Sequence, residues 1–461
     1  MTVGAAGTQV TVTPSGSLQP MLAYSLTVST AVRGLGGEQL ASSLSLAFTT
    51  RGGAWSTPVL IESDDAGNVR NPQVAIDDSG NAVAIWDEFD GTRYNIWTNR
   101  YVAGTGWGTA AVLENDPGDA FGPHVALDAS GNAIAVWQQS DGTRYNIMAS
   151  VFTPPSGWST PTPIENDPND ARNVQLAMNT HGDAFAVWTQ GFPVRPVVWA
   201  RRYLAGSGWN ALTRIQGDTS GDGFFPQVAI DPNGAAVATW HQTDGTRYNV
   251  WADRYTPGTG WDIAQLIEND NTDNAEFAQV AMDAAGNATA VWQQHDGTRF
   301  NIMSNRLPSG GDWGSAVAID DEDEAATDPH IGMNDAGDAI VLWVQQLGTT
   351  YNVAANRYTT AGGWATAQVI ETEVGNAIEP RIAISQSGVA HATWMQDDGT
   401  RYNIVAGRYV PGSGWETPAT IEMESGGVFN SSIAVNRSGT VQAIWRQHDG
   451  ARYNVWAGRY E

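Results

Sequence analysis

Polar residues suited to ligand binding recur through the sequence at a fixed spacing. In one copy Trp137 is followed by Gln139, Asp141, Arg144 and Asn146, and most of eight copies repeat these types. Carboxylate, guanidinium and amide groups can bond sugar hydroxyls, while Trp or Tyr stacks on the sugar ring. Asp before Gly also suits a tight turn, and Arg can pair with that Asp or with a neighbouring copy. The pattern therefore indicates scaffold, with eight shallow equivalent sites, as in multivalent lectins, as the alternative.

A second polar set opens the first strand expected in each copy, and here the residue type changes from copy to copy. Such variation can encode specificity, whereas wet lining of a channel is the alternative interpretation. His124, His330 and Arg381 are the strongest polar handles. The predicted ligand-binding residues are Gln73, His124, Gln175, Gln227, Gln279, His330 and Arg381, and Ser432 completes the set.

Acidic segments join successive copies, for example residues 114–119, 165–170, 268–273 and 320–324. Closely spaced Asp, Asn and Glu supply the oxygen ligands that calcium uses, but none of these segments matches the twelve-residue calcium loop. We expect solvated loops and no cofactor, with Ca²⁺ in these loops as the alternative. Their negative charge favours neutral ligands, or acidic ligands bridged by a cation.

Known catalytic patterns are absent from the sequence. It contains no Gly-x-Ser-x-Gly, no His-Glu-x-x-His, no phosphate loop and no Cys. Four His of the repeat region, His181, His241, His295 and His448, stand singly without repeated partners. We therefore predict no catalytic residue.

Two ladders of Trp define the elements that must position these residues. Within each ladder successive Trp are 51 or 52 residues apart, as from Trp86 to Trp137 or from Trp55 to Trp107. Each copy contains four segments with strand-like alternation and no segment with helical periodicity. Four-stranded units of about 50 residues are typical of propeller blades. The sequence predicts an all-β fold, an eight-bladed β-propeller over residues 51–461.

The order of the segments also predicts how the ring closes. The first fourth-type strand, near residues 55–62, precedes any first-type strand, and the last copy ends after its third strand. The N-terminal strand can therefore complete the last blade and leave no open sheet edge. Residues 1–50 lie outside the repeat and give three further strands, near 10–13, 24–29 and 44–50.

The hairpin Asp128-x-x-Gly131-Asn132 followed by Trp137 resembles the Asp-box turn of sialidase-like propellers, although the order of its residues differs. Over residues 51–461 the repeat resembles that of large bacterial exported or surface β-propeller proteins, which often adjoin Ig-like domains. Residues 1–50, with their Gly36-Gly37 turn and final Phe-Thr-Thr, resemble the end of a bacterial Ig-like domain. The resemblance implies an extracellular or cell-surface location within a larger multidomain protein, with the propeller itself monomeric.

Composition limits the partners. The 23 basic and 49 acidic residues give a net charge of −26, which argues against nucleic acid and anionic membranes. No apolar run approaches the ~20 residues of a membrane span, and no signal peptide is visible. The third copy, around 190–197, loses the Asp-Gly turn and gains two Pro, through decay of one blade or as a functional loop.

These observations favour a non-enzymatic binding or adhesion module, lectin-like, that holds a glycan or protein ligand at the channel mouth. The alternative is a polysaccharide-active enzyme, a glycoside hydrolase or lyase, with its site at the same mouth. Hydrolysis would require two carboxyl groups there, about 5–5.5 Å apart for retention or about 6.5–9.5 Å apart for inversion.

Overall fold

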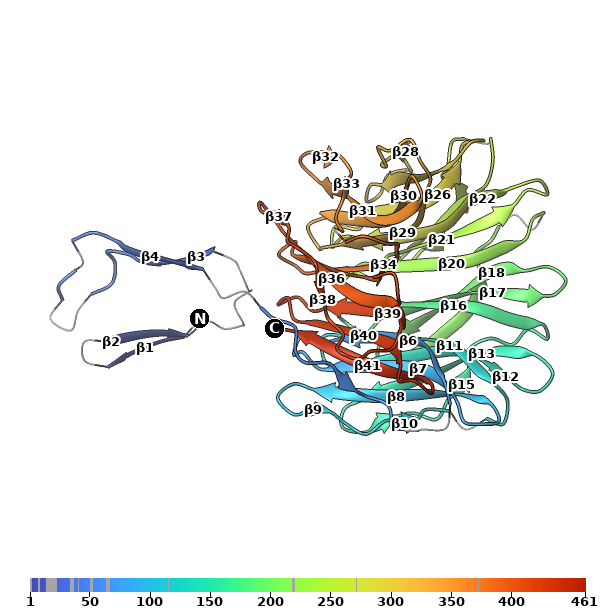
Figure 1. Cartoon of the computed structure of the whole chain (residues 1–461), viewed down its shortest axis with the longest axis horizontal. Coiled ribbons are helices and arrows are strands. Elements are labelled where there is room, and N and C mark those ends of the chain that lie inside the picture. Colours follow the sequence, from blue (N-terminus) through green and yellow to red (C-terminus); the bar gives the residue numbers. More distant parts are fainter. Residues whose placement is uncertain are drawn as a thin grey trace.

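The protein is an eight-bladed β-propeller. The computed structural model describes residues 2–6, 9–13, 23–33, 37–39, 41–49, 53–63, 67–114, 116–217, 220–270, 272–371 and 373–461. Eight antiparallel sheets stand around one ring, in which each innermost strand contacts the next and β39 contacts β6 (Figure 1). The described residues contain no helix, and thus none that could span a membrane. The predicted fold class and blade number are confirmed.

Each blade runs outward from the channel through an innermost, a second, a third and an outermost strand. The innermost strands are β6 (Val69–Ile76), β11 (Ala120–Leu127), β16 (Asp170–Met178), β20 (Gly223–Ile230), β25 (Ala275–Met282), β29 (Ala326–Met333), β34 (Ala377–Ile384) and β39 (Val428–Val435). The second strands are β7 (Ala82–Phe89), β12 (Ala133–Ser140), β17 (Ala184–Phe192), β21 (Ala236–Thr243), β26 (Ala288–His295), β30 (Ala339–Leu347), β35 (Ala390–Asp397) and β40 (Val441–His448).

The outer half of each blade is less regular. The third strands are β8 (Tyr94–Val102), β13 (Tyr145–Thr153), β18 (Val197–Leu204), β22 (Tyr248–Thr256), β27 (Phe300–Leu307), β31 (Thr350–Thr359), β36 (Tyr402–Val410) and β41 (Tyr453–Tyr460). The outermost strands are mostly short pieces: β9 (Gly106–Trp107), β10 (Ala111–Val112), β14 (Gly157–Trp158), β15 (Thr162–Pro163), β19 (Gly208–Arg214), β23 (Gly260–Trp261), β24 (Gln265–Leu266), β28 (Val317–Ala318), β32 (Gly363–Trp364), β33 (Gln368–Val369), β37 (Gly414–Trp415) and β38 (Ala419–Thr420).

The two ends of the repeat region close the ring. β5 (Val59–Leu60) pairs with β41, and Trp55 forms a bridge with Tyr460. Blade 8 therefore takes three strands from the C-terminal end and its outermost strand from the N-terminal side. Without β5, β41 would present an unpaired edge to solvent. The predicted closure is confirmed.

The first Trp ladder forms the core of the blades. All eight Trp are fully buried, from Trp86 to Trp445. A buried indole N–H needs an acceptor, and the side chain two residues later supplies it, at 2.8–3.2 Å in every blade. That residue is Gln in seven blades and Glu88 in blade 1. The repeated Trp and Gln are thus scaffold.

Aromatic rings make contacts both within a blade and between neighbouring blades. Second-ladder Trp lie edge-on against an aromatic residue of the third strand, as Trp415 does against Tyr409 with ring centroids 5.6 Å apart. At six of the eight junctions an Arg of one third strand lies over the aromatic ring of the next, 3.8–5.8 Å from its centroid. Arg459 over Tyr101 continues this series across the closure. Sequence analysis missed these cation–π contacts, which hold the ring together.

Two hairpins precede the propeller (Figure 1). β1 (Thr2–Ala6) pairs with β2 (Gln9–Thr13), and β3 (Ala23–Val28) pairs with β4 (Leu44–Thr49). The three strands predicted in this region correspond to β2, β3 and β4, whereas β1 was not predicted. The predicted boundary between residues 50 and 51 lies outside the described residues. The Ig-like assignment stays a prediction.

Candidate functional site at the channel mouth

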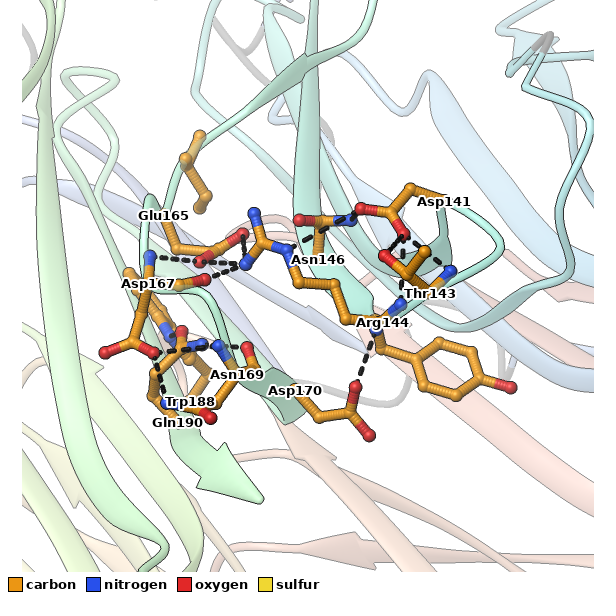
Figure 2. A network of polar contacts seen from close by, with 12 residues as sticks. Asp141, Thr143, Arg144, Asn146, Glu165, Asp167, Asn169, Asp170, Trp188 and Gln190 are labelled. Atoms are coloured by element: carbon orange, nitrogen blue, oxygen red, sulfur yellow. Dashed lines mark hydrogen bonds and ion pairs between the residues drawn. The ribbon is translucent and has the colours of Figure 1, made fainter. Parts of the chain in front are cut away.

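The repeated Asp of each Asp-Gly turn organises that turn (Figure 2). Asp141 accepts hydrogen bonds from the backbone N–H and hydroxyl of Thr143 and from the Arg144 N–H, at 2.6–3.0 Å, and from the Asn146 amide at 3.1 Å. These donors hold the pKa of Asp141 well below its usual range. Comparable bonds form at Asp90, Asp244, Asp296, Asp398 and Asp449. The carboxylate is used by the turn itself, as the scaffold interpretation predicted.

The repeated Arg pairs with the acid that opens the link to the next blade (Figure 2). Arg144 lies 3.3 Å from the buried carboxylate of Glu165 and also bonds the Asp167 carbonyl. Arg299 with Asp320 and Arg401 with Glu422 repeat the pair. Burial raises the pKa of these carboxyl groups, and the nearby Arg opposes that rise.

The acidic links are thus less solvated than expected, because their first acid is buried against Arg. Where blade 6 has Thr350 in place of this Arg, burial and the charge of Glu373 raise the pKa of Glu371. Among the described residues no three acidic or His side chains are grouped so as to hold a metal ion. Calcium binding in the links stays a prediction.

The predicted ring of ligand residues lies deeper than expected. Innermost strands begin four or five residues earlier, so Gln73 is the fifth residue of β6 and His124 the fifth of β11. A β-bulge separates Arg70 from Gln73, and pairing with β7 resumes on both sides of it. The first strand of each copy was expected to open at this polar set, but β6 also includes Pro72, since an innermost strand has one free edge and tolerates proline. The mouth is therefore formed by the residues before the proline position.

Of the three strongest predicted ligand residues, His330 and Arg381 lie close together, whereas His124 lies apart. The charge of Arg381 adds to burial in lowering the pKa of His330, so these two side chains are neighbours on β34 and β29. Burial lowers the pKa of His124 to about 4. Both His are therefore neutral at pH 7 and act as hydrogen-bonding groups rather than cations. The structure does not test whether Gln73, Gln175, Gln227, Gln279 or the other ring members bind a ligand.

A ring of left-handed residues forms the rim of the mouth. One residue of each bulge has φ between 46° and 57°, and the eight stand 51 or 52 residues apart. This conformation costs a residue other than glycine ~1–2 kcal/mol, and such strain gathers at functional sites. The ring consists of Asn71, Gly122, Asn173, Phe225, Phe277, Asp328, Glu379 and Asn430.

Side chains of the preceding blade support half of this rim. The backbone N–H of the left-handed residue bonds the side chain that follows the buried Trp, as from Gly122 to Asp87 at 3.3 Å and from Asp328 to Gln293 at 3.1 Å. Gln138 and His241 serve Asn173 and Phe277 in the same way, each at 3.4 Å. The type at this supporting position changes between blades, so the mouth has no eightfold symmetry.

Residues of blades 2 to 5 line an aromatic pocket of ≈ 510 Å³ at the rim. Phe225 and Phe277 keep 43% and 41% of their surface exposed there, although both have strained backbones. Their rings lie 5.9 Å apart, and His241 lies against both. The lining residues are Gln138, Arg172, Asn173, Phe192, Phe224, Phe225, His241, Tyr248, Glu276 and Phe277.

The electrostatics of the pocket follow from burial. Burial lowers the pKa of His241 to about 4, so its ring is neutral at pH 7. Because its Nδ1 accepts the Phe277 N–H, the proton lies on Nε2, which leaves the ring a donor there. Burial, with the charge of Asp273, raises the pKa of Glu276. Arg172 pairs with Asp170 and lies over the rings of Tyr145 and Phe192.

The divergent third blade supplies one wall of this pocket. Loss of the Asp-Gly turn lets β17 run on to Phe192, which lines the pocket. Gly191 makes this path possible, since a Cβ there would lie 2.4 Å from the Arg195 carbonyl oxygen. Of the two interpretations of this segment, a contribution to a local site agrees with the geometry.

Comparison with known proteins extends the fold assignment. No protein-family model and no curated protein sequence matches the chain. Among solved structures, a protein of unknown function from Dyadobacter fermentans is 9% identical over 89% of this chain and 99% of its own, with TM-score 0.44. A leech intramolecular trans-sialidase is 7% identical over 89% and 93%, with TM-score 0.41. An ulvan lyase, described as a polysaccharide lyase of a new family, is 12% identical over 79% and 96%, with TM-score 0.48. Likeness of this size carries no argument about activity.

Proposed function

We propose that the protein binds a carbohydrate chain at the channel mouth, with one sugar ring stacked on the exposed surface of Phe225 and Phe277. The proposal rests on one observation: two phenylalanines are exposed at the rim in a backbone conformation that costs each ~1–2 kcal/mol. Core packing cannot explain two exposed rings held in this way. A paired, accessible aromatic surface suits the apolar face of a sugar.

Polar groups around the two rings fit the same ligand. Gln138 and Tyr248 carry donors and acceptors, Arg172 carries a fixed donor fork, and Glu276 carries the pocket's carboxyl group. Sugars alternate apolar faces with hydroxyl edges, so a stacking pair ringed by polar groups can bind both. An extracellular or cell-surface location within a larger protein belongs to this proposal, because polymeric glycans are displayed there.

The second candidate is a polysaccharide lyase acting in the same pocket. Tyr248 lies 4.9 Å from His241, beside Arg172 and Glu276, so the lining combines groups that can transfer a proton with a cation that can neutralise a sugar carboxylate. The two-carboxylate hydrolysis considered from the sequence fits less well, because Glu276 is the single Asp or Glu among the described residues that line the pocket.

Glycan binding by the purified chain tests the proposal. On a glycan array the wild type should bind at least one polysaccharide, and Phe225→Ala with Phe277→Ala should weaken that binding about tenfold or more, through loss of stacking. Tyr351→Ala is the matched control, because Tyr351 is a 45% exposed aromatic residue of blade 6, outside the pocket. An equal loss with Tyr351→Ala, or no glycan bound, would refute the proposal.

Turnover separates binding from catalysis. If the protein is a lyase, bound glycans should yield unsaturated ends that absorb ultraviolet light, and Tyr248→Phe should abolish their formation while binding persists. Stable binding without new ends would support the non-enzymatic module.

A further inference from the structure

Two arginines lie near one another at the mouth where blades 8 and 1 meet. The guanidinium carbon of Arg70 lies 4.2 Å from the ring centroid of Tyr94. That of Arg446 lies 5.0 Å from the Tyr453 ring and 5.3 Å from the Phe429 ring. A guanidinium stacked in this way keeps its N–H edge available for an anion.

Apart from this stacking, neither guanidinium is bonded to the scaffold. In the part of the chain that the structure describes, Arg70 and Arg446 form no hydrogen bond and no ion pair, unlike the arginines of the Asp-Gly turns. The Arg446 Nε is buried without a partner. Burial, with the like charge of Arg70, lowers the pKa of Arg446. A second cation beside a half-buried one is unfavourable unless an anion is bound.

The neighbouring acids Asp87 and Glu379 offset part of this charge, but they bond other groups. Asp87 is fully buried, and its carboxylate already accepts bonds from the Asn71 amide and the Gly122 N–H. Burial raises the pKa of Asp87 to about 6. Glu379 bonds the Asn430 amide instead. Both carboxylates thus lie near enough to act on the Arg446 charge, but in the described part of the chain neither forms an ion pair with Arg446 or Arg70.

We propose that Arg70 and Arg446 bind an anionic group, a carboxylate or a sulfate ester, carried by the carbohydrate chain. The inference rests on the proposed function and names the class of ligand. It departs from the neutral or cation-bridged ligand expected from net charge, because the first acid of a link is buried and paired with Arg, as in Asp320 and Glu422, whereas these two arginines have no such partner. Guanidinium groups match the planar geometry of carboxylate and sulfate oxygens.

A continuous aromatic path leads from the arginine pair to the pocket. Tyr94 lies 5.2 Å from Phe121, which lies 6.2 Å from Tyr145. Arg172 lies 5.3 Å from the rings of both Tyr145 and Phe192, and the latter begins the pocket. A ligand that reaches both ends must span three blades, so it is an acidic oligosaccharide or polysaccharide rather than a single sugar.

Matched acidic and neutral polysaccharides test the inference. The probes are uronate polymers with their carboxyl-reduced counterparts, and sulfated polymers with their desulfated counterparts, measured by calorimetry at constant salt. At least one acidic member should bind about tenfold or more tightly than its neutral counterpart. Whether reduction or desulfation removes the gain identifies the anion.

Three variants assign this preference. Arg70→Gln with Arg446→Gln should abolish it while binding of the neutral counterpart persists. Arg214→Gln, which removes an exposed arginine of β19, should leave it unchanged. Asp87→Asn, which removes the buried counter-charge, should strengthen acidic binding, an outcome that misfolding cannot imitate.

The results separate the two proposals. If acidic and neutral members bind equally, the arginine pair has no such role and the proposed function stands. If no member binds at all, both proposals fail. If the preference survives Arg70→Gln with Arg446→Gln, or Asp87→Asn weakens acidic binding, the anion is bound elsewhere and the inference is wrong.

Discussion

His391 makes the closure of the ring sensitive to acid. It lies on β35 with 1% of its surface exposed, against Tyr460 with ring centroids 4.6 Å apart and against Trp55 at 6.4 Å. Burial, with the charge of Arg408, lowers its pKa from 6.5 to about 3. Its Nε2 is buried and has no partner. Protonation would therefore place an unsolvated cation against Tyr460 of β41 and against Trp55, the two residues that bridge the ends of the ring.

The magnitude follows from linkage. Because the folded pKa is depressed, the unfolded chain takes up the proton first, so stability is complete above pH 6.5 and falls as the pH drops toward 3. At ~1.36 kcal/mol per pH unit, this one group should cost about 2 kcal/mol at pH 5.

The test compares wild type with His391→Gln by chemical denaturation at pH 7 and pH 5. Gln is a suitable replacement, because Gln442 occupies the equivalent buried position of blade 8. We expect the variant to lose about 2 kcal/mol less than the wild type between the two pH values. His181→Gln, at an exposed turn, should follow the wild type. Parallel losses in wild type and His391→Gln would refute the reasoning.

Two further predictions concern the rim and the ion pairs. At Phe277, which has φ 54°, the Phe277→Gly protein should be more stable than Phe277→Ala by about 1 kcal/mol in thermal or chemical unfolding. At Phe121, which has no positive φ, the Gly variant should be less stable than the Ala variant by roughly 0.5–1 kcal/mol. The same sign at both sites would contradict the strain argument. Arg401→Thr should lower the free energy of unfolding by about 2 kcal/mol, because it leaves the buried Glu422 without its arginine. Adding Glu422→Gln, the residue type that blade 3 has in Gln216, should recover at least half of that loss. No recovery would show that the charge of Glu422 is not the cause.

The blade number and the closure were predictable because a period of 51 or 52 residues records one structural unit. The phase of the copies placed the strand near residues 55–62 in the last blade, where β5 now pairs with β41. The scaffold role of Trp137 and Gln139 was also predictable, since a residue type repeated in nearly every copy supports the structure that all blades share.

The start of the innermost strands was misplaced because each strand was expected to open at the polar set, as at Gln73, whereas β6 begins at Val69. The aligned column of left-handed residues held a signal, since Asn71, Gly122, Asn173 and Asn430 are the types that tolerate positive φ. In blades 4 and 5 the same position holds Phe225 and Phe277, whose residue type does not indicate a positive φ. The arginine pair could not be found from sequence, because Arg70 and Arg446 are more than 370 residues apart and meet through closure.

The closure also sets when the protein can become a ring. β5 precedes every blade in the chain and β41 is the third strand of the last blade, and the bond between Ser56 and the Arg459 N–H spans 403 residues. Until β41 is made, the blades form an open crescent with one face at each end lacking its neighbour. In a flexible chain, joining ends so distant would carry an entropic cost of roughly 5 kcal/mol, and blades that are already folded reduce this cost by bringing the ends together. A variant that lacks β41 would keep most of its blades and lose the pairing with β5 that closes the ring.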